Sequence, residues 1–342
     1  MLVFSYGAEL SQIESDRLLR LAFQGSARGL TLFFVLSGYL LYLPFARRDF
    51  GDGGPVDLPR YARNRILRIV PLYLAAVWLL LILQEHGGTL EQWLLLSTFS
   101  GGLDYAETES VLPVSWTLVA ELHFYLLLPP LAWAIGRLGR GSMRRAVLVL
   151  GLLAVGSVAV RYETLYAGEG SRFLILSLPG IFFFFATGMG LALLRVRWDR
   201  RPPALPAPAD RAWAWVALAA VFLVASACWF ARWPELLAAP FAFLLIGACV
   251  LPVREGLITR VLEWRPLVAV GVASYSLYIW HYALLRWLSG AYGDAADSRA
   301  LLAVALPLVL SVAAVSYLLV ERPFLRLRRR WSPERSAEPA LR

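Results

Sequence analysis

The feature that most constrains this chain is its series of apolar stretches, each long enough to cross a membrane. A bilayer core needs about 20 mainly apolar residues per spanning helix. Nine stretches qualify, at about 29–46, 65–83, 114–135, 146–160, 172–194, 212–230, 236–252, 267–287 and 300–320. The chain is also 59% hydrophobic and only 17% charged, whereas soluble domains are about 45–50% apolar and about 25% charged. A water-soluble enzyme is therefore excluded. We expect an all-α polytopic membrane helix bundle with nine complete transmembrane helices.

The first ten residues supply a partial tenth helix. Residues 1–10 are apolar but cover only half a bilayer before Glu14, Asp16 and Arg17. They lack the basic region and the small-residue cleavage site of a signal peptide. We interpret them as the C-terminal half of a spanning helix whose beginning is missing, which gives a ten-span topology. One membrane domain is expected over 1–331, followed by a polar cytoplasmic tail over 332–342.

The basic residues orient these helices. All 33 of them are arginine, and the formal net charge is +9. Alternate connections between the apolar stretches, together with the C-terminus, hold 25 of the 33 arginines, and such an excess marks the cytoplasmic side. The sequence therefore predicts a multi-pass protein of the cell membrane with a cytoplasmic C-terminus, and the charge needs no nucleic-acid partner. Cys228 and Cys249 lie in apolar runs, so we expect neither a disulfide framework nor a metal site.

Polar residues inside apolar spans are costly and are candidates for function. Ser37 and Gly38 interrupt the first complete span, although such a pair also suits close helix packing. Glu121 and Tyr125 are four residues apart and share a helix face, whereas His123 points elsewhere. A structural hydrogen-bond network is the alternative for this second group.

An arginine cluster lies at the cytoplasmic start of the next span, with Arg63, Arg65 and Arg68. Arg65 and Arg68 are three residues apart and share a helix face. Arg63 and Arg65 do not share a face within a helix, so Arg63 either points elsewhere or precedes the helix. Guanidinium groups at a helix N-terminus bind phosphate by geometry and dipole together. Membrane anchoring by snorkelling side chains is the alternative. The depth of Arg68 in the span favours a phosphate clamp.

Two further groups lie in the last two spans. Ser274, Tyr278 and His281 follow an i, i+4, i+7 spacing and so lie on one helix stripe. His281 is either catalytic or an ordinary histidine of a helix bundle. Glu321 is followed directly by Arg322 and Pro323 at the cytoplasmic end of the last span, where a local ion pair is the plain expectation.

Five motifs in this order resemble the acyltransferase-3 family of integral membrane acyltransferases, which O-acetylates surface polysaccharides of the cell envelope and, in some members, macrolides. The resemblance covers about 29–331. It rests on Phe33-Phe34-Val35-Leu36-Ser37-Gly38-Tyr39-Leu40, Arg65-Ile66-Leu67-Arg68-Ile69-Val70-Pro71, Trp116-Thr117-Leu118 with Glu121 and Phe124-Tyr125, Tyr275-Ser276-Leu277-Tyr278 with Trp280-His281, and Glu321-Arg322-Pro323.

The resemblance implies transfer of an acyl group, often acetyl from acetyl-CoA, to a hydroxyl on a sugar, polysaccharide or macrolide-like acceptor. Acyl-CoA would be a co-substrate, with no permanently bound cofactor, and its phosphates would meet Arg63, Arg65 and Arg68. Transfer needs a general base and donors for an oxyanion. The catalytic candidates are Glu121, His281 and His123, and the substrate-binding candidates are Ser37, Gly38, Trp116, Tyr125 and Tyr278.

The chain departs from the family pattern at the expected base. Family members carry an essential His in the first span with an Arg about ten residues before it, whereas Val3-Phe4-Ser5-Tyr6-Gly7 contains none and no His precedes His86. If Tyr6 occupies that position, its phenol stays protonated at neutral pH. His123 also stands where the family commonly has Gln. Three explanations stay open: a start assigned too far downstream, a base relocated to His123 or His281, or loss of transferase activity.

Two other classes of function compete with an acyltransferase. A transporter would use broken helices and inverted repeats; Pro179-Gly180 and Pro240 interrupt two spans, but we find no repeat. A non-catalytic scaffold of envelope enzymes is the third class. The outer connection 84–113 offers Trp93 and Tyr105 as sugar-stacking faces, although interfacial aromatics explain them equally.

Overall fold

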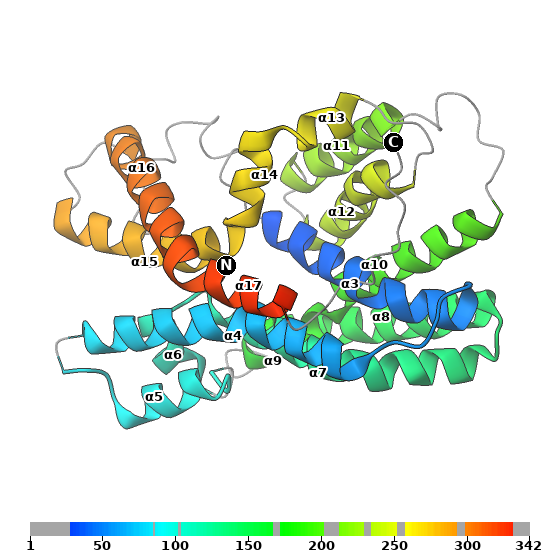
Figure 1. Ribbon diagram of the computed structural model, residues 1–342, viewed down its shortest axis with the longest axis horizontal. Helices are drawn as coiled ribbons and strands as arrows, with labels where there is room; N and C mark the ends of the chain where they lie inside the picture. The colour runs from blue at the N-terminus through cyan, green and yellow to red at the C-terminus, as the bar shows by residue number, and fades with distance from the viewer. Residues whose placement is uncertain are drawn as a thin grey trace. The chain divides into compact units, whose positions relative to one another are not determined.

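A computed structural model describes residues 28–84, 86–101, 104–166, 172–201, 212–228, 234–251, 257–292 and 298–330. Every element in these ranges is a helix, as Figure 1 shows, which confirms the all-α prediction. The partial span expected over 1–10 and the tail expected over 332–342 lie outside the described residues.

The longest apolar helices support a multi-pass membrane protein. Among the described residues, six segments are long and apolar enough to cross a bilayer, and a pair of helices bent by 66° gives a seventh if it is one span. Four of the six are single helices: α3 (Gly29–Phe50), α4 (Leu58–Ile82), α7 (Ser115–Gly139) and most of α8 (Met143–Tyr166). The fifth, Leu174–Arg200, combines α9 (Arg172–Leu176) with α10 (Leu178–Arg200). The sixth, Ala303–Arg328, combines α16 (Ser298–Ser316), the π-helical turn η4 (Tyr317–Glu321) and α17 (Arg322–Arg330). The bent pair is α14 (Arg265–Val272) and α15 (Ser274–Tyr292).

Two apolar helices that lie over expected spans are shorter than this. The apolar α11 (Ala212–Cys228) and α12 (Pro234–Val250) cover two of the expected spans, and α13 (Leu257–Leu262) is a short connecting helix. The expected number of nine complete spans therefore stays a prediction.

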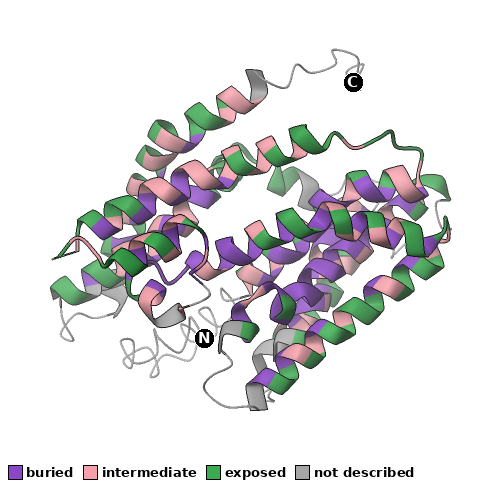
Figure 2. Cartoon of the chain, turned by 90° about the horizontal axis from the view of Figure 1, so that it is seen from below, coloured by how far each residue is buried: buried purple, intermediate pink, exposed green. Residues whose placement is uncertain are grey.

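The helices carry a buried face and an exposed face, drawn in purple and green in Figure 2. The exposed faces are themselves apolar: α8 exposes Leu148, Leu152 and Val155, and Leu306 and Leu319 are exposed near the end of the chain. Apolar surface on the outside is costly in water but suits a lipid environment, where the backbone polar groups are satisfied within each helix. The burial pattern therefore agrees with the hydropathy of the sequence.

The described residues form two compact units. The first comes from Met1–Val56, Ala120–Val270 and Tyr292–Leu301, and its helix α10 packs against α3, α8 and α12. Two glycines allow α3 and α10 to approach closely. A Cβ on Gly38 would overlap the carbonyl oxygen of Phe185, and a Cβ on Gly188 would overlap that of Val35 and lie 2.7 Å from the amide nitrogen of Tyr39. Small residues at helix crossings are typical of membrane bundles.

The break between α9 and α10 is filled by side chains of α8. The Ser157 hydroxyl donates to the Pro179 carbonyl at 2.6 Å and accepts from the Phe183 amide at 3.0 Å. The buried Arg161 donates to the Ile175 carbonyl at 2.9 Å. These bonds satisfy backbone groups that the proline frees. The Pro179-Gly180 interruption is thus a packed structural break, which removes one argument for a transporter.

The second unit comes from Asp57–Val119, Gly271–Ala291 and Leu302–Arg342, and the expected connection 84–113 folds within it. This connection contains two short helices, α5 (Leu90–Ser97) and α6 (Tyr105–Val111). Thr89 and Gln92 form a capping box that starts α5. The Gln92 amide also donates to the Glu107 carboxylate and the Ser110 hydroxyl, both at 3.1 Å. The sequence analysis predicted only an outer connection over 84–113, and the capping box marks a helix within it.

The glycine contact between α3 and α10 generates a stability prediction. Gly188→Ala should lower the thermal midpoint of the detergent-solubilised protein by several degrees, since overpacking a tight contact costs about 1–3 kcal/mol. Gly190→Ala is the matched control on the same helix, because nothing lies within 4 Å of its added Cβ. Equal midpoints for the two variants, measured by tryptophan fluorescence on heating, would contradict the close approach.

Candidate functional site

The residues singled out in the sequence fall into three groups of polar contacts. One group surrounds Glu121 in the first unit. The other two belong to the second unit, one around Arg68 and one around His281.

Glu121 is held by hydroxyl groups in the first unit. Glu121 is 3% exposed, and its carboxylate accepts from the Ser37 hydroxyl of α3 at 3.2 Å and from the Tyr125 hydroxyl one turn along α7. The predicted sharing of a face by Glu121 and Tyr125 is confirmed. Hydrogen bonds to a buried carboxylate offset part of its desolvation. The group can therefore hold a carboxylate in a fixed orientation inside an apolar bundle.

The neighbours of this group have different surroundings. Gly38 lies in backbone contact with Phe185, as the helix-packing alternative requires. His123 is on the exposed face of α7, on the opposite side from the buried Glu121 and Phe124. Trp116, in the first turn of α7, is half-buried in the second unit. Within the first unit, His123 therefore points away from the buried side of α7 that carries Glu121.

The arginine cluster lies wholly inside α4. The Asp57 side chain caps this helix by accepting from the Arg60 amide at 2.9 Å, and a proline follows in the first turn. Arg63 therefore does not precede the helix. Arg65 places its guanidinium carbon 6.0 Å from the ring centre of Tyr61, one turn earlier. Such a stack of cation on ring is typical of arginine.

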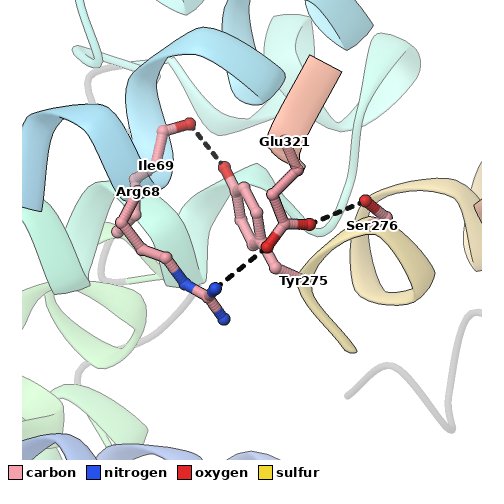
Figure 3. A network of polar contacts seen from close by, with 5 residues as sticks. All are labelled: Arg68, Ile69, Tyr275, Ser276 and Glu321. Carbon is pink, nitrogen blue, oxygen red and sulfur yellow. Dashed lines mark hydrogen bonds and ion pairs between the residues drawn. The ribbon is translucent and has the colours of Figure 1, made fainter. Parts of the chain in front are cut away.

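Arg68 is joined to the far end of the chain, as Figure 3 shows. Its Nη1 lies 2.9 Å from Oε1 of Glu321, whose side chain is 1% exposed. The Ser276 hydroxyl donates to Oε2 of the same carboxylate at 2.8 Å. Tyr275, which precedes Ser276, donates from its hydroxyl to the carbonyl of Ile69, which follows Arg68, at 2.7 Å. These contacts tie α4, α15 and η4 together within the second unit.

The local ion pair expected for Glu321 is therefore wrong. Glu321 pairs with Arg68, 253 residues away, whereas Arg322 is exposed. Adjacent residues on a helix do not face each other, so Arg322 cannot follow Glu321 into the interior. A buried ion pair of this kind contributes little to the net stability of the protein. Removing one partner nevertheless destabilises the protein strongly, because the other charge stays buried without compensation.

His281 has a defined tautomer in the second unit. Its Nδ1 lies 2.6 Å from the backbone carbonyl oxygen of Tyr278. Because a carbonyl can only accept, Nδ1 carries the proton and Nε2 keeps its lone pair. The Tyr278 hydroxyl lies 2.6 Å from the Thr117 hydroxyl and 3.3 Å from the Val114 carbonyl. The contacts of the Tyr278 hydroxyl hold the helix turn that carries His281. The Nε2 atom of His281 can then accept a proton.

Helix α15 places these contacts in a linear order. Ser276 is bonded to Glu321 of the Arg68–Glu321 ion pair, and Tyr278 and His281 follow along the helix. Arg286 then donates to the Ser110 carbonyl of α6 at 3.2 Å. At 1.5 Å of rise per residue, Ser276 and His281 are about 7.5 Å apart along the axis. The arginine cluster and the imidazole therefore lie at different depths of one unit.

The predicted site residues did not include the Thr117, Tyr275, Ser276 and Glu321 side chains of these groups, nor Asn64 of α4. Glu321 carried a usable signal, because a carboxylate at the end of an apolar span requires a partner. Thr117 and Ser276 were quoted only as parts of motifs. Asn64 is the sole asparagine of the chain.

Comparison with known proteins identifies the class to which these features belong. The model of the acyltransferase domain family, acyltransferase-3, matches residues 4–321. The chain therefore belongs to the acyltransferase domain family, as its motifs predicted.

Two relatives come from Staphylococcus aureus and Bacillus subtilis. O-acetyltransferase OatA of Staphylococcus aureus (strain NCTC 8325 / PS 47) is 24% identical over 322 residues, which are 87% of this chain and 52% of OatA. YrhL of Bacillus subtilis (strain 168), named provisionally as a peptidoglycan O-acetyltransferase, is 27% identical over 290 residues, which are 76% of this chain and 44% of YrhL. The chain thus spans about half the length of the curated relatives it matches. No solved structure matches it.

The ion pair of Figure 3 generates a double-mutant prediction. Arg68→Ala and Glu321→Ala should each destabilise the solubilised protein, and the double variant should lose less than the sum, with a coupling of about 1–3 kcal/mol. The physical reason is that either single change leaves an uncompensated charge. Ile66→Ala, at an exposed position of α4, is the control. Strict additivity of the three thermal midpoints would show that the pair does not form in solution.

Proposed function

We propose that the protein is a membrane-embedded O-acyltransferase that moves an acetyl group from acetyl-CoA to a hydroxyl of a carbohydrate acceptor. The observation that carries the proposal is His281, whose Nδ1 is bonded to a backbone carbonyl while Nε2 can accept a proton. Family membership supports the reaction type. The names of OatA and YrhL support an O-acetylated acceptor, and YrhL's name points to peptidoglycan.

The arginine cluster of α4 is the proposed contact for the donor. CoA carries a diphosphate and a 3′-phosphate, and guanidinium groups match phosphate geometry better than any other side chain. Arg65 is stacked on Tyr61, and Arg68 is fixed by Glu321. Because Arg68 remains 31% exposed beside that carboxylate, part of its guanidinium is accessible to a phosphate.

The proposed reaction is a direct transfer. His281 Nε2 takes the proton from the acceptor hydroxyl while the hydroxyl oxygen attacks the thioester carbonyl carbon. The tetrahedral intermediate collapses, the carbon–sulfur bond breaks, and the CoA sulfur leaves as a thiolate. The imidazolium then gives its proton to that sulfur, which restores His281 and balances the charge. In this proposal His281 takes the role of general base that the family resemblance assigns to a histidine of the first span.

The buried Glu121 is a second candidate for contact with the acceptor. It already accepts from two hydroxyl groups, those of Ser37 and Tyr125. A carboxylate that binds protein hydroxyls is chemically suited to bind sugar hydroxyls as well. The exposure of His123 on α7 makes it the weaker of the two histidines proposed from the sequence.

A comparison of the histidines tests the proposed base. In native membranes or proteoliposomes supplied with acetyl-CoA and soluble peptidoglycan fragments, His281→Ala should lower kcat by about 10²-fold or more, the usual contribution of general-base catalysis. His86→Ala, at an exposed position, is the control and should behave like wild type. Thiol release from CoA gives the rate. Unchanged turnover in His281→Ala would remove this residue from catalysis.

The proposed donor contact predicts a different kinetic effect. Arg65→Ala should raise the KM for acetyl-CoA about tenfold with little change in kcat, because it removes binding that is equal in the ground and transition states. The same variant should lose the rise in thermal midpoint that acetyl-CoA gives the wild-type protein. A wild-type protein that acetyl-CoA does not stabilise would favour a transporter or a scaffold.

We also propose that the C-terminus faces the cytoplasm, on the side where acetyl-CoA is made available. The arginine distribution supports this orientation. A C-terminal alkaline phosphatase fusion should be inactive, and a C-terminal green fluorescent protein fusion should be fluorescent. The reverse pair of results would invert the topology and separate the arginine cluster from a cytoplasmic donor.

A further inference from the structure

Asn64 contains a buried acceptor that receives no hydrogen bond from the described residues. It lies in the second turn of α4, between Arg63 and Arg65. Its Oδ1 is buried and accepts no hydrogen bond within the part of the chain that the structure describes. Leaving a buried acceptor unsatisfied costs about 1–3 kcal/mol. Such atoms are rare in folded proteins and call for a physical explanation.

Arginines of two helices lie near Asn64. Arg63 and Arg65 flank it in sequence, and Arg65 is stacked on Tyr61. Arg68 lies one turn further along α4, about 6 Å away along the axis. Helix α17, which packs against α4, adds the exposed Arg322 and Arg326. The arginines can bind the negative groups of a ligand. The Asn64 oxygen can accept a hydrogen bond from a neutral N–H group of the same ligand.

We infer that Asn64 recognises the adenine ring of the acyl-CoA donor, an inference that rests on the proposed function. The Asn64 Oδ1 would accept from the exocyclic amine of adenine, and its amide group would donate to the ring nitrogen N7. Asparagine and adenine form this bidentate pair through complementary donors and acceptors. The plane of the Arg65 guanidinium, supported by Tyr61, offers a stacking surface for the same ring.

The order of contacts along the helices favours adenine over the amide groups of the pantetheine arm. The arm must run from the phosphates to the thioester, towards His281. Ser276 contacts the Arg68–Glu321 pair, and His281 lies further along α15. Asn64 lies on the other side of Arg68, towards the start of α4. A ligand whose phosphates meet Arg68 and whose thioester lies towards His281 has its adenosine end at Asn64.

The test compares two donors that differ at one group. Acetyl-CoA is set against the analogue in which hypoxanthine replaces adenine, so that a carbonyl oxygen replaces the exocyclic amine. For the wild-type protein the KM of the analogue should be about five- to tenfold higher, the range expected for one lost hydrogen bond. In Asn64→Leu and Asn64→Ala the two donors should have equal KM values. Ile66→Ala, the exposed neighbour on α4, should keep the wild-type ratio.

A binding measurement makes the inference independent of turnover. Adenosine 3′,5′-bisphosphate should raise the thermal midpoint of the wild-type protein more than inosine 3′,5′-bisphosphate does, and the Asn64 variants should lose the difference. Turnover of acetyl-CoA without any discrimination between the two bases would overturn the role of Asn64. Discrimination in binding without any acetyl transfer would overturn the proposed reaction and keep the adenine site. Because the wild-type protein alone gives both results, a variant that fails to fold does not block the test.

Discussion

A polar group inside a bilayer must find its hydrogen-bond partner within the protein, and the described contacts of this chain follow from that requirement. The lipid cannot solvate the Glu321 carboxylate, so Arg68 and Ser276 do so from two other helices. The Pro179 carbonyl, freed by a helix break, receives the Ser157 hydroxyl for the same reason. Each of these bonds joins segments distant in sequence, so that satisfying a polar group also fixes the packing of two helices.

This constraint also separates the chemical candidates from the structural ones. Glu321 and Arg161 are each bonded to protein groups of other helices, which holds those helices in place. His281 uses one ring nitrogen in a bond to its own helix and leaves the other available. Asn64 has an acceptor that the described protein leaves unmet. In a bundle where most polar atoms are paired internally, the unmet ones are the atoms that a ligand can bind.

The sequence predicted what depends on periodicity and could not predict what depends on long-range pairing. The apolar stretches indicated helices, and the i, i+4 spacing predicted the contact of Glu121 with Tyr125. The partner of Glu321 was missed because it lies 253 residues away, and no local pattern carries that information. The helices α5 and α6 were missed although Thr89 and Gln92 form a readable cap, because short helices within a connection have too little apolar periodicity to stand out.

The π-helical turn at Tyr317–Glu321 has a geometric consequence for the end of the chain. A π turn takes up one residue more than a regular helical turn, and one residue corresponds to about 100° of rotation around the helix axis. The turn therefore resets the angular position of everything that follows it. With a regular period, the exposed apolar side of α16 would continue into a different side of α17. Glu321 would then point about 100° away from Arg68. A single inserted residue thus lets one continuous helix face hydrocarbon with an apolar side and, immediately afterwards, turn an acid inward and arginines outward.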